Sequence, residues 1–144
     1  MSWVGILQKA GITSDGTDVT VDGKLNPLGG IMTFAAATGL QNIQVWYHCA
    51  SVDDETSVTL PGTASNNRGF WFVIDRTGGV VNGIVYHDAN ADTVTLMANH
   101  SNFVKTDDDG KLCFLSAAGI ATVKNHLGAA KTIDILGLFA DDFS

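Results

Sequence analysis

Apolar side chains along most of this sequence occur in short or alternating runs, and turn-forming residues separate the runs. Alternation of apolar and polar positions with a period of two is typical of strands with one buried face. Turn signals such as Asp-Gly, Pro-Gly and Gly-Gly recur about every ten residues, which favours an antiparallel sandwich or barrel. The runs predict strands near Val19–Val21, Ile31–Ala36, Ile43–Ala50, Ser57–Leu60, Gly69–Asp75, Val80–His87, Thr93–Ala98, Asn102–Lys105, Lys111–Leu115, Ala121–Asn125 and Thr132–Phe139. We therefore predict an all-β fold, an antiparallel β-sandwich of jelly-roll type.

The first residues follow a different pattern. Trp3, Ile6 and Leu7 share one face of a short helix that Ser2 can cap and Gly11 can end. The 144 residues fit one domain, and no stretch has the composition of a linker. We predict an N-terminal arm or short helix over residues 1–18, a β-sandwich over residues 19–139 and a C-terminal tail over residues 140–144.

The strongest hairpin signal covers residues 68–86. Its first arm, Arg68 to Asp75, is followed by the turn residues Arg76-Thr77-Gly78-Gly79 and by an apolar return arm. The first arm contains an unbroken apolar run from Phe70 to Ile74, so both of its faces require cover. A second chain could supply the outer cover, or a single thick sandwich could bury the whole strand. Asn82-Gly83, inside the return arm, predicts a β-bulge.

Aromatic residues that are adjacent on a strand face opposite sides of the sheet. One member of the pair Trp46 and Tyr47, and one member of the pair Phe70 and Trp71, is therefore expected to point outward. Exposed rings can stack on a sugar or fill a subunit interface, where Tyr and Trp are enriched, and we favour the interface. The residues predicted to supply it are Phe70, Trp71, Phe72, Trp46 and Tyr47.

Composition and charge exclude several classes of protein. Hydrophobic residues make up 45% of the chain and charged residues 16%, which argues against disorder. Glu55 is the only Glu beside fourteen Asp, which disfavours long helices. The net charge of −7 disfavours binding to nucleic acid. No apolar run has the length of a membrane span, and the start of the chain lacks the features of a signal peptide. We expect synthesis in a cytoplasm, without Sec export.

The two cysteines are expected to be reduced. Disulfides are rare in the cytosol, and Cys49 and Cys113 each lie within an apolar run. A free Cys in such a run behaves as a small hydrophobic residue. We therefore predict two buried thiols.

No motif indicates catalysis. The four histidines are widely spaced, and the sequence has no His-x-His, His-Glu-x-x-His, Cys-x-x-Cys, Gly-x-Ser-x-Gly or Walker A motif. We therefore predict that the protein is not an enzyme and uses no cofactor.

One segment has the spacing of a weak Ca²⁺ site. Asp88, Asn90 and Asp92 place oxygen atoms as the start of an EF-hand loop does. Thr93 and Asn99, however, occupy the positions at which that loop has Gly and Glu. We interpret the segment as a polar turn whose Asp side chains bond their own backbone, and the segment from Asp107 to Gly110 in the same way.

Several strand segments of the C-terminal half follow one another in a suggestive order. They are Val58-Thr59-Leu60-Pro61, Asn67-Arg68-Gly69-Phe70-Trp71-Phe72-Val73-Ile74-Asp75, Thr93-Val94-Thr95-Leu96, Asp109-Gly110-Lys111-Leu112-Cys113-Phe114 and Thr122-Val123-Lys124-Asn125-His126-Leu127-Gly128-Ala129-Ala130-Lys131-Thr132-Ile133. This order, over roughly residues 56–139, is similar to that of β-rich structural proteins of tailed bacteriophages. Such proteins decorate capsids or tip fibres, usually as homotrimers, and carry no catalytic residues.

The resemblance implies a virion structural protein, a capsid decoration or fibre subunit. Its partners would be identical copies in a homotrimer and other virion proteins, such as a major capsid or tail protein. The N-terminal residues Trp3, Ile6 and Leu7 and the C-terminal tail are candidate docking arms. The alternative is a receptor- or glycan-binding module on the same particle, and a small hydrolase or lyase on a jelly roll is the least favoured hypothesis.

Overall fold

The computed structural model describes three short strands within the first forty residues and then residues 41–61, 68–78 and 81–142. All regular elements of these residues are β-strands, which confirms the all-β prediction. The predicted N-terminal helix, with Trp3, Ile6 and Leu7, lies outside the described residues. Among the residues that are described, no helix has the length and apolar character needed to cross a membrane.

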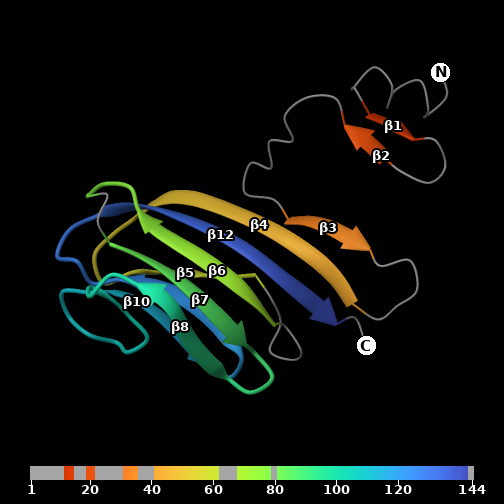
Figure 1. Cartoon of the computed structure of the whole chain (residues 1–144). Coiled ribbons are helices and arrows are strands. Elements are labelled where there is room, and N and C mark those ends of the chain that lie inside the picture. Colours follow the sequence, from red (N-terminus) through yellow and green to blue (C-terminus); the bar gives the residue numbers. More distant parts are fainter. Residues whose placement is uncertain are drawn as a thin grey trace.

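The strands form three sheets (Figure 1). One pairs β1 (Ile12–Ser14) with β2 (Val19–Val21). The second has four strands in the order β5-β11-β10-β9, namely Ser57–Thr59, Ile120–Asn125, Leu112–Ala117 and Phe103–Val104. The third has six strands in the order β3-β4-β12-β6-β7-β8, namely Ile31–Ala35, Gln41–Val52, Lys131–Asp142, Arg68–Asp75, Asn82–Asp88 and Thr93–Asn99.

These strands lie close to the predicted ones, with two differences. β1 falls in the predicted N-terminal arm, because its only apolar residue is Ile12 and it therefore shows no alternation, unlike Val19–Val21. β12 continues to Asp142, into the segment predicted as a tail, and pairs with β4 throughout. All pairings are antiparallel except that of β9 with β10.

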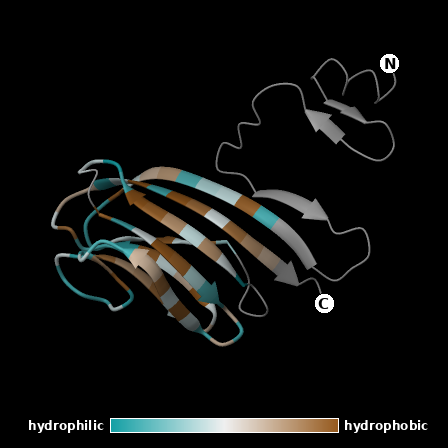
Figure 2. Cartoon of the chain, viewed as in Figure 1, coloured by the Kyte–Doolittle hydropathy of each residue, from teal (hydrophilic) through white to brown (hydrophobic). Residues whose placement is uncertain are grey.

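The core lies between the four-stranded and six-stranded sheets. Its buried side chains come from both layers, and Figure 2 shows apolar positions alternating along the strands. Trp71 of β6 stacks on Phe139 of β12, with ring centroids 5.2 Å apart, and meets Trp46 of β4 edge-on at 6.0 Å. The architecture is thus the expected antiparallel β-sandwich.

Two inward-facing glycines leave room for large rings. A Cβ at Gly137 of β12 would lie 2.3 Å from the ring of Trp71, and a Cβ at Gly83 of β7 would lie 2.2 Å from the ring of Phe103. The β6–β7 hairpin is confirmed, and its register runs unbroken past Gly83. The bulge predicted at Asn82-Gly83 is wrong: the register shifts between β7 and β8, where Met97 is the extra residue. Gly83 instead allows close approach of an aromatic ring.

Candidate protein interface

The outer face of the six-stranded sheet, turned away from the four-stranded sheet, exposes large apolar side chains. β6 alternates strictly between exposed and buried residues, so its outer side chains remain uncovered within this chain. The structure therefore contradicts the alternative in which a single sandwich buries both faces of β6. We call the following set the apolar face, whose first six members are 37–46% exposed: Tyr47, Phe70, Phe72, Ile74, Leu136, Leu138, with the half-buried Ile84 and Tyr86.

Strand register arranges seven of these residues in two rows, and Ile74 lies beside the second row, opposite Asp134 and Asn82. In the first, Leu138, Phe70 and Tyr86 are cross-strand partners, and the rings of Phe70 and Tyr86 lie 5.4 Å apart. The second row runs across four strands through Tyr47, Leu136, Phe72 and Ile84. Cross-strand neighbours on one face have Cβ atoms about 4.5–5.5 Å apart, so the rows form a continuous apolar surface.

A hollow between β6 and β7 indents this surface. Its volume is about 230 Å³, and it is lined by Phe72, Val73, Ile74, Asn82, Gly83 and Ile84. Most of the lining is apolar, and the hollow is open to solvent. An apolar side chain from another molecule could therefore insert there.

Charged residues flank the two rows on either side along the strand direction, where they are paired. Arg68 Nε lies 3.0 Å from Asp88 Oδ2 on one side, and Arg76 Nε lies 3.3 Å from Asp134 Oδ2 on the other. The Tyr47 hydroxyl donates a hydrogen bond of 3.1 Å to Asp134. Burial, and then the contact with Asp134, raise the pKa of Tyr47, so the phenol stays neutral. Between these two sides, the rows contain no charged side chain.

The predicted interface residues divide between this face and the core. Tyr47, Phe70 and Phe72 are on the apolar face, which confirms that one member of each adjacent aromatic pair points outward. Trp46 and Trp71 are 8% and 2% exposed, so they are core residues and were wrongly included among surface contacts. Leu136 and Leu138 were missed, although β12, like β6, has apolar residues on both of its faces.

The two cysteines differ in their exposure to solvent. Both are free, but Cys113 is buried and Cys49 is exposed, so the prediction of a buried thiol is wrong for Cys49. Cys49 lies two residues after Tyr47 on β4 and shares its outward direction. Its Sγ accepts a weak hydrogen bond from Arg76 at 3.8 Å. Burial raises the pKa of the Cys113 thiol.

The weak Ca²⁺ candidate forms a hydrogen-bonded turn. Asp88 accepts bonds from the backbone N–H groups of Asn90 and Ala91, as the polar-turn interpretation predicts. Asp92 accepts bonds from the Ser116 hydroxyl at 2.5 Å and from the backbone N–H groups of Ala118 and Gly119. These bonds lower the pKa of Asp92 and link the β7–β8 turn to the β10–β11 turn, one from each sheet.

His87 completes this network but does not form a catalytic triad. Its Nε2 lies 2.9 Å from Ser116 Oγ. The Ser116 hydroxyl gives its one proton to Asp92, so His87 must donate to Ser116. In a triad, the histidine lies between the acid and the nucleophile and accepts the serine proton. Burial lowers the pKa of His87, which keeps the ring neutral.

Replacing Asp92 with Ala is expected to lower the melting temperature, because three donors at the turn–turn contact lose their acceptor. Differential scanning calorimetry measures the change. Asp53→Ala is the control, because the Asp53 side chain is exposed and this residue bonds Thr56 through its backbone carbonyl, so the change should leave the midpoint near that of the parent. Millimolar Ca²⁺ should not raise the midpoint; a rise in the parent that Asp92→Asn abolishes would contradict the turn interpretation.

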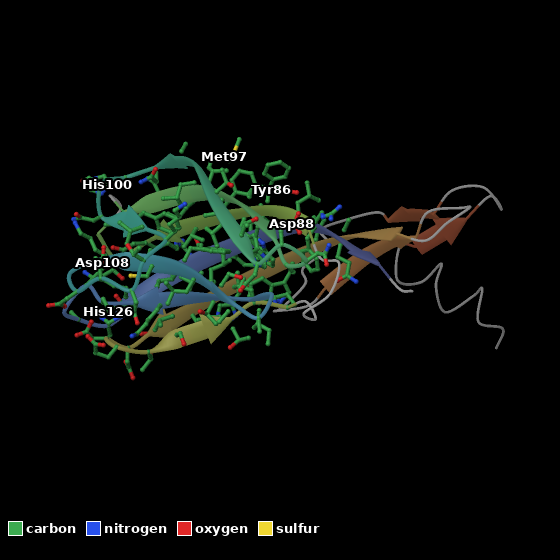
Figure 3. All side chains as sticks on the ribbon, turned by 90° about the horizontal axis from the view of Figure 1, so that it is seen from below. Tyr86, Asp88, Met97, His100, Asp108 and His126 are labelled. Atoms are coloured by element: carbon green, nitrogen blue, oxygen red, sulfur yellow. The ribbon has the colours of Figure 1, made fainter. Side chains whose placement is uncertain are left out.

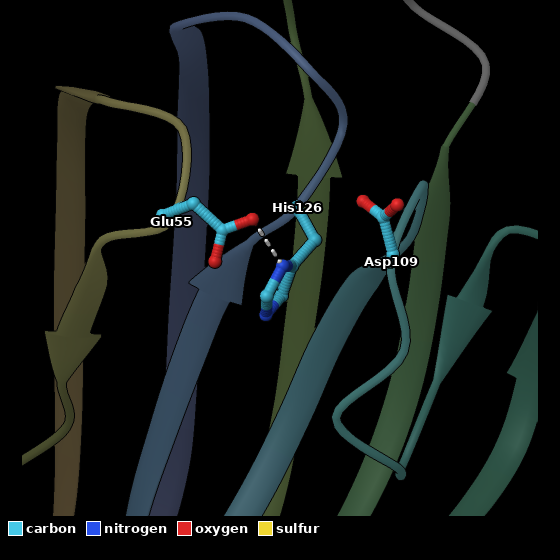
Figure 4. Close-up of side chains that lie close together, drawn as sticks. All are labelled: Glu55, Asp109 and His126. Atoms are coloured by element: carbon cyan, nitrogen blue, oxygen red, sulfur yellow. Dashed lines mark hydrogen bonds and ion pairs between the residues drawn. The ribbon is translucent and has the colours of Figure 1, made fainter.

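A second cluster joins loops at one end of the sandwich. His126 Nδ1 lies 2.8 Å from Glu55 Oε1 (Figure 4). Its Nε2 lies 2.6 Å from Asp107 Oδ1. Glu55, Asp109 and His126 could each place one ligand atom within 4.8 Å of the others. Both ring nitrogens already bond carboxylates, however, and Lys124 is an ion-pair partner in the same cluster. The arrangement is therefore that of an ion-pair network.

The two surface features differ in what they can do. The apolar face has no acid–base pair and can bury itself against another apolar surface. The charged cluster can hold loops together. Comparisons of the chain with protein-family models, with curated proteins and with solved structures give no match.

Proposed function

We propose that this protein is a structural subunit of a virion and that identical copies assemble through the apolar face. The observation that carries the proposal is the continuous apolar surface across β4, β12, β6 and β7. An exposed aromatic or aliphatic side chain at about 40% contributes on the order of 80 Å². The six most exposed residues of the face therefore supply roughly 480 Å², the size of the largest apolar patch on a typical monomer, about 300–600 Å², and such patches are often functional. A standard interface buries about 800 Å² per partner.

Charge favours a second copy as the occupant of this face. The chain carries a net charge of −7, so two copies repel each other over most approaches. The rows of the apolar face carry no charge, and Arg68 and Arg76 neutralise the acids that flank them. Two such faces can therefore meet without placing like charges together. Two copies that meet through the same part of this face form a two-fold dimer. A homotrimer, the form that the phage resemblance implies, needs two different parts of the face in contact around a three-fold axis.

The virion role is supported by the order of strand segments between residues 56 and 139, which resembles β-rich phage structural proteins. In this proposal the protein is made in the host cytoplasm and is incorporated into the particle. Its other partner would be a major capsid or tail protein. The N-terminal residues Trp3, Ile6 and Leu7 remain candidates for the contact with that partner.

Replacing Phe70 with Ser is expected to dissociate the oligomer and leave the fold intact, because Phe70 is 42% exposed and lies at the centre of the first row. Loss of a buried Phe at about 1.5–3 kcal/mol weakens each contact by roughly tenfold to a hundredfold. Sedimentation velocity measures the assembly state, and circular dichroism measures the fold. Ile120→Ser is the matched control, because Ile120 is also 42% exposed but belongs to the four-stranded sheet.

A parent protein that is monomeric at micromolar concentration would refute assembly through this face. The competing hypothesis is glycan binding, for which the exposed rings of Tyr47, Phe70 and Phe72 are the relevant observation. A monomeric parent that binds sugars on a glycan array, and loses that binding in Tyr47→Ser, would support the glycan hypothesis instead. An oligomer without glycan affinity supports the structural role.

A further inference from the structure

His126 connects three loops that are far apart in sequence. It lies at the start of the β11–β12 loop, Glu55 lies in the β4–β5 turn, and Asp107 lies in the β9–β10 loop. The His126 backbone N–H also donates to the carbonyl of Lys111, at 2.9 Å. The His126 side chain is 9% exposed, whereas those of Glu55 and Asp107 are 60% and 53% exposed. Figure 3 shows His126 and Asp108 at the same end of the sandwich, far from Asp88.

The two contacts of the ring require a charged imidazole. A carboxylate only accepts hydrogen bonds, and a neutral imidazole donates from only one of its nitrogens. Glu55 and Asp107 can both be satisfied at 2.8 and 2.6 Å only by the imidazolium form. Burial opposes this charge, but the hydrogen bonds to Asp107 and Glu55 outweigh it and raise the pKa of His126 above its usual 6.5.

The proton on His126 changes the balance of charge in the cluster around the ring. The groups that face it are Glu55, Asp107 and Asp109, and Lys124 from β11, whose Nζ lies 3.1 Å from Asp107 and 3.9 Å from Glu55. When His126 is charged, three carboxylates face two cations. When His126 is neutral, the same three carboxylates face Lys124 alone, and one of the two acceptors of the ring loses its donor.

We propose that His126 is a proton-dependent lock, which holds the three loops together while its ring is charged between Glu55 and Asp107 and releases them when the ring loses its proton. Because the pKa is higher in the folded chain than in the unfolded chain, the stabilisation is fully present below about pH 6.5. It is lost as the pH rises through the folded pKa. The lock is independent of the proposed assembly, since it lies among end loops and not on the apolar face.

An NMR titration of the His126 ring in the full chain tests the charged state. The expected midpoint lies above 6.5 in the parent and moves down in Asp107→Asn and in Glu55→Gln, each of which removes one carboxylate contact. The corresponding midpoint of His87, whose Nε2 bonds Ser116 and not this cluster, should not move in these variants. A parent midpoint for His126 at or below 6.5 would overturn the proposal.

Amide hydrogen exchange tests the release of the loops. The N–H groups of Glu55 and His126 bond across loops, to Asn125 and Lys111, and the Val73 amide of β6 serves as the internal reference. After correction for intrinsic rates, the protection of the loop amides relative to Val73 should fall by about threefold or more above the His126 midpoint. In Asp107→Asn this fall should shift to lower pH together with the midpoint. Protection that stays constant across the parent titration would show that His126 locks nothing.

Discussion

Replacing Trp71 with Ala is expected to lower the free energy of unfolding by about 3–5 kcal/mol, the usual range for loss of a large buried aromatic residue. Trp71 is 2% exposed, stacks on Phe139 and meets Trp46 edge-on, so its removal leaves a cavity among three strands of the sheet. Surrounding rings cannot fill that cavity without leaving their own contacts. Urea denaturation followed by circular dichroism measures the change in free energy.

Ile120→Ala serves as the control for this substitution, because Ile120 is 42% exposed and lies outside the core. Its cost should stay below about 1 kcal/mol. If Trp71→Ala cost as little as Ile120→Ala, the aromatic cluster would not be the structural centre of the sandwich.

Replacing Gly137 with Ala is expected to cost about 1–3 kcal/mol, although it adds only one methyl group. Its Cβ would lie 2.3 and 2.7 Å from two carbon atoms of the Trp71 ring. Gly137 belongs to β12, which is hydrogen-bonded to β4 on one side and β6 on the other, so its backbone cannot move without disturbing both pairings. Gly78→Ala in the β6–β7 turn is the control, because its Cβ would come no closer than 3.2 Å to another atom, Asp75 Oδ2, so its cost should be smaller than that of Gly137→Ala.

The double variant Gly137→Ala with Trp71→Phe identifies the cause of that cost. The smaller ring leaves space for the new methyl group, so the double variant should be more stable than the sum of the two single changes by about 0.5–3 kcal/mol. Simple additivity of the two changes would exclude the Trp71 ring as the obstacle.

Local patterns were sufficient to predict most of the strands. Side chains alternate between core and solvent on β6, β7 and β11, but β6 and β7 were predicted from apolar runs bounded by turn residues, because their apolar residues are consecutive. Pairing across long separations leaves no such local signal. The parallel pairing of β9 with β10 and the bulge at Met97 depend on which strands become neighbours, and therefore neither was predicted.

In the candidate sites, too, features set by the local pattern were predicted, and features set by contacts between distant segments were not. The outward directions of Phe70 and Tyr47 follow from alternation, once one neighbour of each is assigned to the core. The ion-pair network at His126 could not be predicted, because Glu55, Asp107 and His126 meet only when three separate loops converge. Asp92 was recognised as a turn residue, but its bonds to the β10–β11 turn depend on how the two sheets pack.

The central position of β12 has a consequence for biosynthesis. This strand is made after the other five strands of its sheet, yet it pairs with β4 along Gln41–Val52 and with β6 along Arg68–Asp75. Until it is made, the nascent chain has a β3–β4 unit and a β6–β7–β8 unit, each with an open edge where β12 belongs. Open edges promote pairing between chains. Aggregation is therefore most favoured during synthesis, when several nascent chains without β12 lie close together on one polysome. Insertion of β12 closes both edges at once, so the six-stranded sheet is completed in one step, after its two halves have been made.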